Sequence, residues 1–484
     1  MTQNTDYIYT IAIIGGGVSG VTAGLRVAEL GISTLLIEQQ NSVVNGPPFC
    51  HLHAGGNLYP DISKDQCVEL LRQSIDMART YPESIDKRPT FISIPKSEEY
   101  EPDDLLKRLD IIVKAYKDLI EKDTHNEVLD DPQAYYKTYT QKELEELERK
   151  KVVVEPQTLD EWMIGVAQQV DYSQLKFPVL LVNEYGWNLF RLAAQAQIAL
   201  EKIEYCDLML NTEVKNIIDH SEEDLLYNWE IETNQGTFYA QYLLNAAGYL
   251  TGEFDNDIGL EEDRLVEFKA AYVSHWQYAG SKLPELIFHG KRGTPHGMAQ
   301  LTPYADGYYQ IHGMTKDITL FKNGLVKSNR EDAQPDLDDD FDYKLDEGWK
   351  QEDIHRRTTR AINYVAQFVP TFKNAEVGGP PLFGAQQIPG EDSSLRVAEI
   401  SFPRKFYARS EIVKASSALD VADRLVEKLK ELNLMDEKLS TDRNFKTLDQ
   451  VPVDDIHSFA QKLASERGYA ADMGKLYHAS IKKA

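Results

Sequence analysis

A glycine-rich turn near the start of the chain carries the first recognisable chemistry. Residues 11–39 contain glycines at positions 15, 17 and 20, in the order Gly-x-Gly-x-x-Gly. This spacing lets the chain turn tightly, lets a pyrophosphate approach the backbone, and lets a helix pack closely on a strand. Glu38 follows at the end of the next apolar run, where a carboxylate can accept hydrogen bonds from ribose hydroxyls. The pattern predicts a dinucleotide site made by Gly15, Gly16, Gly17, Val18, Ser19, Gly20, Glu38 and Gln39.

Histidine and cysteine side chains form a second group of reactive types, in residues 49–59. Cys50, His51 and His53 offer three metal ligands, whereas a closed zinc site takes four. The two histidines can equally form hydrogen bonds beside a bound cofactor. We favour the second interpretation and predict no metal site.

A third group lies in residues 291–315, which are rich in aromatic and basic side chains. Arginine and tyrosine can hold a carboxylate, through a planar fork and a hydroxyl donor. Histidine can act as a base at neutral pH. Each of these residue types is also common in packed or exposed positions without any catalytic role. The candidate catalytic residues from this segment are Arg292, His296, Tyr308 and His312.

The elements around these groups follow from hydrophobic periodicity. Residues 11–37 read as strand, glycine turn, helix and second buried strand, which is typical of a doubly wound α/β fold. Residues 264–320 alternate aromatic and β-branched runs with Gly and Pro, which favours an antiparallel sheet. Helices are predicted in residues 100–151, 189–199 and 411–432 and beyond 433, strands in 207–218 and 229–244, and a solvated acidic loop without bound calcium in 331–347.

Composition excludes several classes of protein. The chain has 484 residues, a net charge of −26 and three cysteines, with no closely spaced cysteine pair. The charge opposes binding to nucleic acid or to anionic membranes, and the cysteines argue against a dithiol flavoreductase. No apolar stretch approaches the roughly 18 residues needed to cross a bilayer, and the first residues lack a signal-peptide pattern, so we predict a cytoplasmic protein.

The chain resembles the D-amino-acid-oxidase-like superfamily of FAD enzymes over most of residues 8–430, and it also resembles malate:quinone oxidoreductases. The resemblance implies FAD rather than NAD, held by three further segments. Residues 49–59 match the loop that runs under the flavin, Val214 matches the strand that meets the adenine, and residues 245–248 match a second FAD contact. The cofactor residues implied by the resemblance are His51, His53, Ala54, Gly55, Val214, Ala246, Ala247 and Gly248.

Two details of the flavin site follow only from the resemblance. His53-Ala54-Gly55 is similar to a setting in which some amine-oxidising relatives attach flavin covalently, so covalent and non-covalent FAD both stay open. Arg409, a further candidate catalytic residue, precedes the predicted helix of residues 411–432 and is implied near the pyrimidine end of the flavin. The sequence departs from the family pattern here, because the glycine-rich turn that the family places before this helix is absent.

The resemblance implies an α/β fold with a Rossmann-like FAD domain made of discontinuous segments, a mixed or antiparallel substrate sheet, and helical insertions. We assign residues 1–95, 185–260 and 375–432 to the FAD domain, 96–184 to a helical insertion or cap, 261–374 to the substrate domain, and 433–484 to a helical appendage. The expected function is hydride transfer to FAD from a small amine, amino acid or 2-hydroxy acid, with oxygen, a quinone or a protein as the electron acceptor. An NAD(P)H-dependent monooxygenase and a non-catalytic flavin-binding subunit are the alternatives.

Overall fold

The first strand, helix and strand form where the sequence predicts them. The computed structural model describes residues 7–53, 62–278, 280–398, 400–436 and 438–481. Strand β1 (Ile8–Ile14) leads through the glycine turn into helix α1 (Val18–Ala28), and strand β2 (Thr34–Ile37) follows. Both strands are almost completely buried, as their continuous apolar sequences require.

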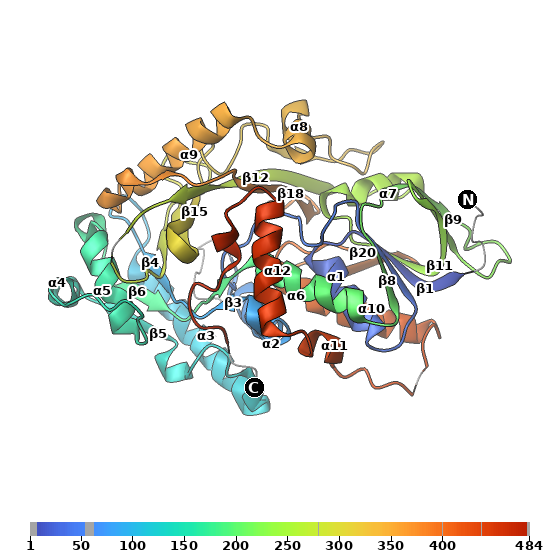
Figure 1. Ribbon diagram of the computed structural model, residues 1–484, viewed down its shortest axis with the longest axis horizontal. Coiled ribbons are helices and arrows are strands. Elements are labelled where there is room, and N and C mark those ends of the chain that lie inside the picture. The colour runs from blue at the N-terminus through green and yellow to red at the C-terminus, as the bar shows by residue number, and fades with distance from the viewer. Residues whose placement is uncertain (1–6, 54–61, 279, 399, 437, 482–484) are drawn as a thin grey trace.

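These elements build a sheet of eight strands whose central part is parallel. Strands β20, β11, β1, β2 and β8 run parallel in that order, while β9, β10 and β19 are added in antiparallel pairs. The further strands are β8 (Cys206–Met209), β9 (Val214–Asp219), β10 (Trp229–Thr233), β11 (Gly236–Asn245), β19 (Ile400–Arg404) and β20 (Tyr407–Ser410). The sheet lies at the right of Figure 1.

A second sheet of ten strands lies beside the first and is centred on the long strand β12 (Arg264–His275), which arches over the molecule in Figure 1. All its pairs are antiparallel except that of β4 with β13, which confirms the predicted mixed or antiparallel sheet. Its other strands are β4 (Thr90–Ser93), β5 (Tyr136–Tyr139), β6 (Val179–Val182), β13 (Glu285–Phe288), β14 (Ala299–Pro303), β15 (Tyr308–Gly313), β16 (Leu325–Lys327), β17 (Glu376–Val377) and β18 (Leu382–Pro389). A short pair, β3 (Ile85–Asp86) with β7 (Gly186–Trp187), forms a sheet of its own.

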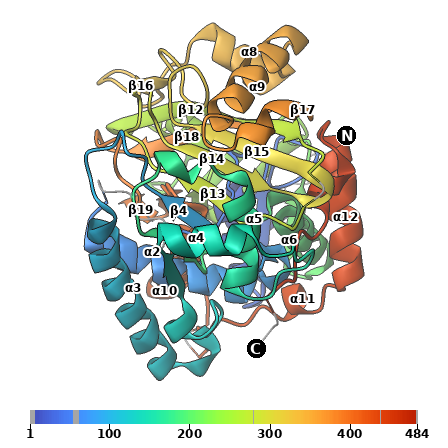
Figure 2. The same ribbon diagram turned by 90° about the vertical axis from the view of Figure 1, so that its left-hand side faces the viewer.

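Helices cover both sheets. They are α2 (Lys64–Thr80), α3 (Pro102–Lys122), α4 (Gln141–Glu148), α5 (Leu159–Gln169), α6 (Leu189–Lys202), α7 (Thr251–Asp257), α8 (Asp339–Glu347), α9 (Gln351–Val365), α10 (Ala418–Glu431), α11 (Lys446–Asp449) and α12 (Val453–Glu466). Helix α9 packs against β12 and β15, and Figure 2 shows α8 and α9 above that sheet. Residues 96–184 supply not only α3, α4 and α5 but also β5 and β6 of the large sheet. Within the described residues, no helix combines the length and the apolarity that crossing a bilayer requires.

The acidic segment 331–347 differs from its prediction as a loop. Helix α8 occupies its second half, with Asp338 as the N-cap and acidic residues in the first turn. Carboxylates near a helix N-terminus interact favourably with the helix dipole, so clustered Asp residues here begin a helix instead of preventing one. Phe341 is buried and anchors the helix.

Candidate active site

The three glycines of the first turn are held by different constraints. A Cβ on Gly15 would lie 2.4 Å from the carbonyl oxygen of Ala246, and one on Gly20 would lie 1.9 Å from that of Gly15. A Cβ on Gly17 would have no neighbour within 4 Å. The chain itself therefore requires glycine at 15 and 20, whereas the space at Gly17 lies open before the N-terminus of α1, where a pyrophosphate would fit.

Glu38 lies beside this turn at the end of β2 and is 8% exposed. Its carboxylate accepts hydrogen bonds from the backbone N–H groups of Gly16 (2.7 Å) and Gln40 (2.8 Å). Burial nevertheless raises the pKa of this carboxyl, against the lowering effect of those two bonds. Gln39, next to it, is exposed, and the Ser19 hydroxyl is hydrogen-bonded to that of Ser410 (2.6 Å).

The second and third predicted FAD segments converge on the same end of the parallel sheet. Ala246 and Ala247 follow β11, and the backbone N–H of Ala246 donates to the carbonyl of Ile14 (2.8 Å). Gly248 has a φ of +64° and open space at its α-carbon. Val214 begins β9, just beyond Thr212, whose N–H donates to the Glu38 carbonyl (3.0 Å).

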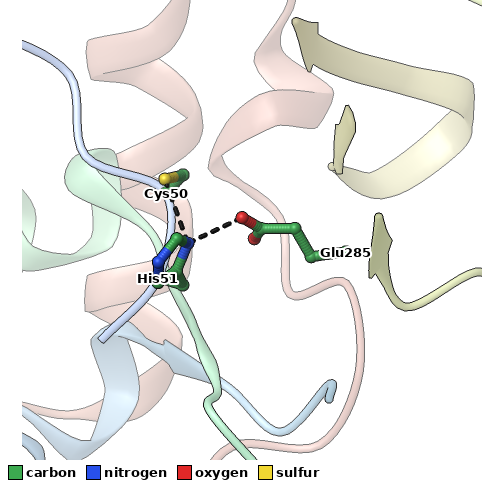
Figure 3. Close-up of side chains that lie close together, drawn as sticks. All are labelled: Cys50, His51 and Glu285. Carbon is green, nitrogen blue, oxygen red and sulfur yellow. Dashed lines mark hydrogen bonds and ion pairs between the residues drawn. The ribbon is translucent and has the colours of Figure 1, made fainter. Parts of the chain in front are cut away.

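His51 lies in a buried cluster of charges (Figure 3). Its Nδ1 is 2.6 Å from Glu285 Oε1, and its Nε2 is 3.7 Å from Glu184. Arg88 donates to the other Glu285 oxygen (2.7 Å), so that two carboxylates balance two cations. Neighbouring anionic groups raise the pKa of His51 well above its ordinary value despite burial, and Glu285, beside two cations, has its pKa lowered to about 2.

As possible metal ligands, the structure groups Cys50 and His51 with Glu285 instead of with His53, which the sequence suggested. The ligand atoms of Cys50, His51 and Glu285 lie within 4.8 Å of one another. However, Arg88 and the Gln300 amide (2.6 Å) already donate to the Glu285 oxygens. The adjacent guanidinium would also repel a metal cation, so the geometry is that of a charge-balanced hydrogen-bond cluster.

His53 stands on the other side of His51, with ring centroids 4.8 Å apart. The Lys414 ammonium donates to His53 Nε2 at 2.9 Å. Burial and the neighbouring cations lower the pKa of His53 well below its ordinary value and lower that of Lys414 to about 7. At neutral pH this pair can therefore both take up and release a proton. Ala54 and Gly55 lie outside the described residues, and covalent attachment through His53 stays a prediction.

A row of contacts connects this pair to Arg292. Arg292 and Lys269 both bind the carboxylate of Glu267, with 2.7 Å between Lys269 Nζ and Glu267 Oε2. Lys269 Nζ donates to Gln386 Oε1 (3.1 Å), and the Gln386 amide donates to the carbonyl of Val413, the residue before Lys414. We call this set the cationic row, made of Arg292, Glu267, Lys269, Gln386, Lys414 and His53.

The other predicted catalytic residues are distributed differently. His312 Nε2 accepts from the Gln310 amide (2.7 Å), and its pKa is lowered to about 4 by burial, with Lys269 and Lys414 contributing. His296 is exposed, and Tyr308 packs against His275, with 4.8 Å between the ring centroids. Arg292 therefore belongs to the cationic row, and His312 lies within electrostatic reach of its two lysines, whereas the contacts of His296 and Tyr308 described here involve neither.

Arg409, which the resemblance implies near the flavin, is held by two carboxylates in the structure. Its guanidinium binds Asp255 (3.1 Å) and Glu262 (2.8 Å), so two carboxylates already neutralise its charge. Lys414, further along the same segment, is the cation that contacts His53. Sequence analysis missed both Lys414 and Lys269, although a lysine within the otherwise buried strand β12 was a usable signal.

Comparisons with known proteins agree with this geometry. A family model described as "FAD dependent oxidoreductase" matches residues 10–378. No curated protein matches the sequence. The L-alpha-glycerophosphate oxidase of Mycoplasma pneumoniae shares 13% identity at a TM-score of 0.56, over 91% of this chain and 98% of its own. Glycine oxidase from Geobacillus kaustophilus shares 14% identity at a TM-score of 0.55, over 90% and 97% of the two chains. L-amino acid deaminase from Proteus vulgaris shares 11% identity at the same TM-score, also over 90% and 97%. These similarities to solved structures establish the fold.

Proposed function

Because this chain belongs to the family of FAD-dependent oxidoreductases, and is therefore an enzyme with FAD as its cofactor, we propose that it oxidises a small amino acid, amine or 2-hydroxy acid. The observation that supports this proposal most is the cationic row, which extends from the large sheet to His53, in the segment that follows β2. Cations of this row would hold the acid group of a substrate.

The proton would leave the substrate hydroxyl or amine for the His53–Lys414 pair. This pair is suited to the task because the Lys414 pKa lies at about 7. His312, with its pKa lowered to about 4, is neutral at neutral pH and would offer hydrogen bonds to the substrate. FAD, when bound, supplies the acceptor for the hydride that the substrate loses.

The residues present fit that cofactor. The open space at Gly17, the Glu38 carboxylate and the Ala246–Gly248 turn lie together at the carboxyl ends of β1, β2 and β11, where α/β sheets bind dinucleotides. The Glu38 position, the turn and the residues around His53 are our proposed cofactor site.

The first test is an absorbance spectrum of the purified protein before and after acid precipitation. Flavin absorbance in the supernatant would show non-covalent FAD, and absorbance in the pellet would show attachment, which His53→Ala would then abolish. Anaerobic bleaching by a panel of amino and 2-hydroxy acids is expected, with oxygen and a soluble quinone then compared as acceptors. Bleaching by NADPH alone would reject the proposal in favour of a monooxygenase.

A further inference from the structure

The cationic row carries more positive charge than one acid group requires. Arg292, Lys269 and Lys414 follow one another along it, and the one carboxylate in the row, that of Glu267, is shared by the first two. Like charges held close together in a partly buried place repel one another unless an anion joins them.

The neighbouring His51 cluster provides an internal comparison. There, Glu285 and Glu184 balance His51 and Arg88, and all four side chains are at most 2% exposed. In the row, by contrast, Lys269 and Arg292 keep 25% and 34% of their side chains exposed. The excess of cations is therefore a local feature of the solvent-accessible row, in a chain whose net charge is −26.

The two ends of the row are separate anchoring points. At one end Lys414 contacts His53, and at the other end Lys269 shares Glu267 with Arg292. Gln386 lies between the two lysines. One acid group beside the reacting carbon would lie at the Lys414 end, where the amine offers N–H donors to it in either protonation state. The Lys269–Arg292 end would then hold a second anionic group on the same molecule, for which both side chains offer several N–H donors.

We propose that the substrate carries two anionic groups, a carboxylate next to the reacting carbon and a second carboxylate or a phosphate held by Lys269 and Arg292. The inference rests on the proposed function for the identity of the reacting group. The binding of a small dianion does not depend on turnover, so the two can fail separately.

The test compares matched compounds that differ in one anionic group. DL-malate is paired with DL-lactate, DL-aspartate with DL-alanine, and DL-2-hydroxy-3-phosphopropionate with DL-glycerate, and anaerobic flavin reduction is followed for each. The dianionic member should half-saturate at a concentration at least 10-fold lower, on the scale of one charge-assisted contact. The preferred pair distinguishes a carboxylate from a phosphate as the second group.

Lys269→Met should remove this preference, Lys269→Arg should keep most of it, and Lys107→Met, at an exposed position of α3, should not change it. Malonate and acetate serve as unreactive probes, followed by the change they cause in the flavin spectrum. Malonate binding that Lys269→Met abolishes, without reduction by any substrate, would support the dianion site and reject the proposed reaction. Equal half-saturation for both members of every pair, or equal loss for both in Lys269→Met, would overturn the inference.

Discussion

Gly17 differs from the other glycines of the first turn in what surrounds its α-carbon. Gly15 and Gly20 face backbone atoms of the protein, while Gly17 faces open space. The sequence motif predicted all three, but it did not separate the two that the fold requires from the one that we assign to the ligand. That distinction needs the position of Ala246, which lies far away along the chain.

Gly17→Val tests this assignment. The folded chain has room for a Cβ at this position, so stability should change by less than about 1 kcal/mol, while the pyrophosphate position is filled and FAD binding is lost. Gly46→Val is the matched control, because Gly46 is exposed and also has no neighbour within 4 Å of a Cβ. Flavin content and thermal unfolding of the two variants should be measured; a Gly17→Val protein that purifies with full flavin would contradict the placement.

Glu285 contributes stability that depends on pH. Its pKa falls from 4.5 to about 2 in the folded protein, because His51 and Arg88 stabilise its charge. The contribution is complete above pH 4.5 and is lost as the pH falls toward 2, and the shift corresponds to roughly 3 kcal/mol.

Glu285→Gln should therefore lower the free energy of unfolding at pH 7 by about 3 kcal/mol, since it leaves buried cations unpaired. The difference from the unmodified protein should shrink as the pH is lowered from 5 to 3 in urea titrations. Glu146→Gln, at an exposed position on α4, is the control and should have almost no effect. A difference that stays constant over this pH range would show that Glu285 is not held by its charge.

At the scale of elements, the C-terminal segment is more than the appendage that its sequence suggests. Helix α12 packs against α6 and crosses it near the centre of the molecule in Figure 1. Just after it, Arg467 donates to the carbonyls of Val43 (2.6 Å) and Val44 (3.0 Å) and to the Ser42 hydroxyl (3.1 Å). The Val44 N–H in turn donates to the Gly16 carbonyl (2.8 Å), so α12 supports the loop beside the dinucleotide turn.

Arg467→Met should weaken FAD binding. Charge-assisted hydrogen bonds contribute about 1.5 to 3 kcal/mol each, so the loss should raise the FAD dissociation constant on the order of 10- to 100-fold. Lys462→Met, on the exposed side of the same helix, is the control. Titration of the apoprotein with FAD by fluorescence quenching measures both, and equal dissociation constants would refute the role of Arg467.

Hydrophobic periodicity predicted α1, α6 and the strands around them because each of these elements buries apolar side chains at one regular spacing. It could not predict the partner of α12, since an amphipathic stripe specifies that a face is covered but not by which element. The same limit applies to the cationic row, whose members come from β12, β18 and three loops. Local patterns found Arg292 and His53, while Lys414 and Lys269 depend on contacts between distant segments.

At the scale of the whole molecule, Asp255 joins the two sheets. This residue of α7 is 0% exposed and binds Arg264 of β12 (2.8 Å) and Arg409 of β20 (3.1 Å). Tyr407 of β20 donates to its other oxygen (2.8 Å). The parallel sheet and the large sheet therefore share one buried carboxylate.

Asp255→Asn removes the charge and keeps the shape. Two buried guanidinium groups lose their common partner, so the free energy of unfolding should fall by about 3 to 5 kcal/mol. Chemical denaturation followed by tryptophan fluorescence measures this, with Asp257→Asn on the exposed side of α7 as the control. Equal midpoints for the two variants would show that the shared carboxylate does not hold the sheets together.

The contact of Arg467 with Ser42 joins residues that are 425 positions apart. During translation, the glycine turn and β2 leave the ribosome long before Arg467 has been made. The loop of residues 42–44 therefore lacks its hydrogen bonds with Arg467 until the segment after α12 has emerged. A chain released before Arg467 has been made would lack these three hydrogen bonds. Tight FAD binding is therefore expected only from a polypeptide that has been translated at least as far as Arg467.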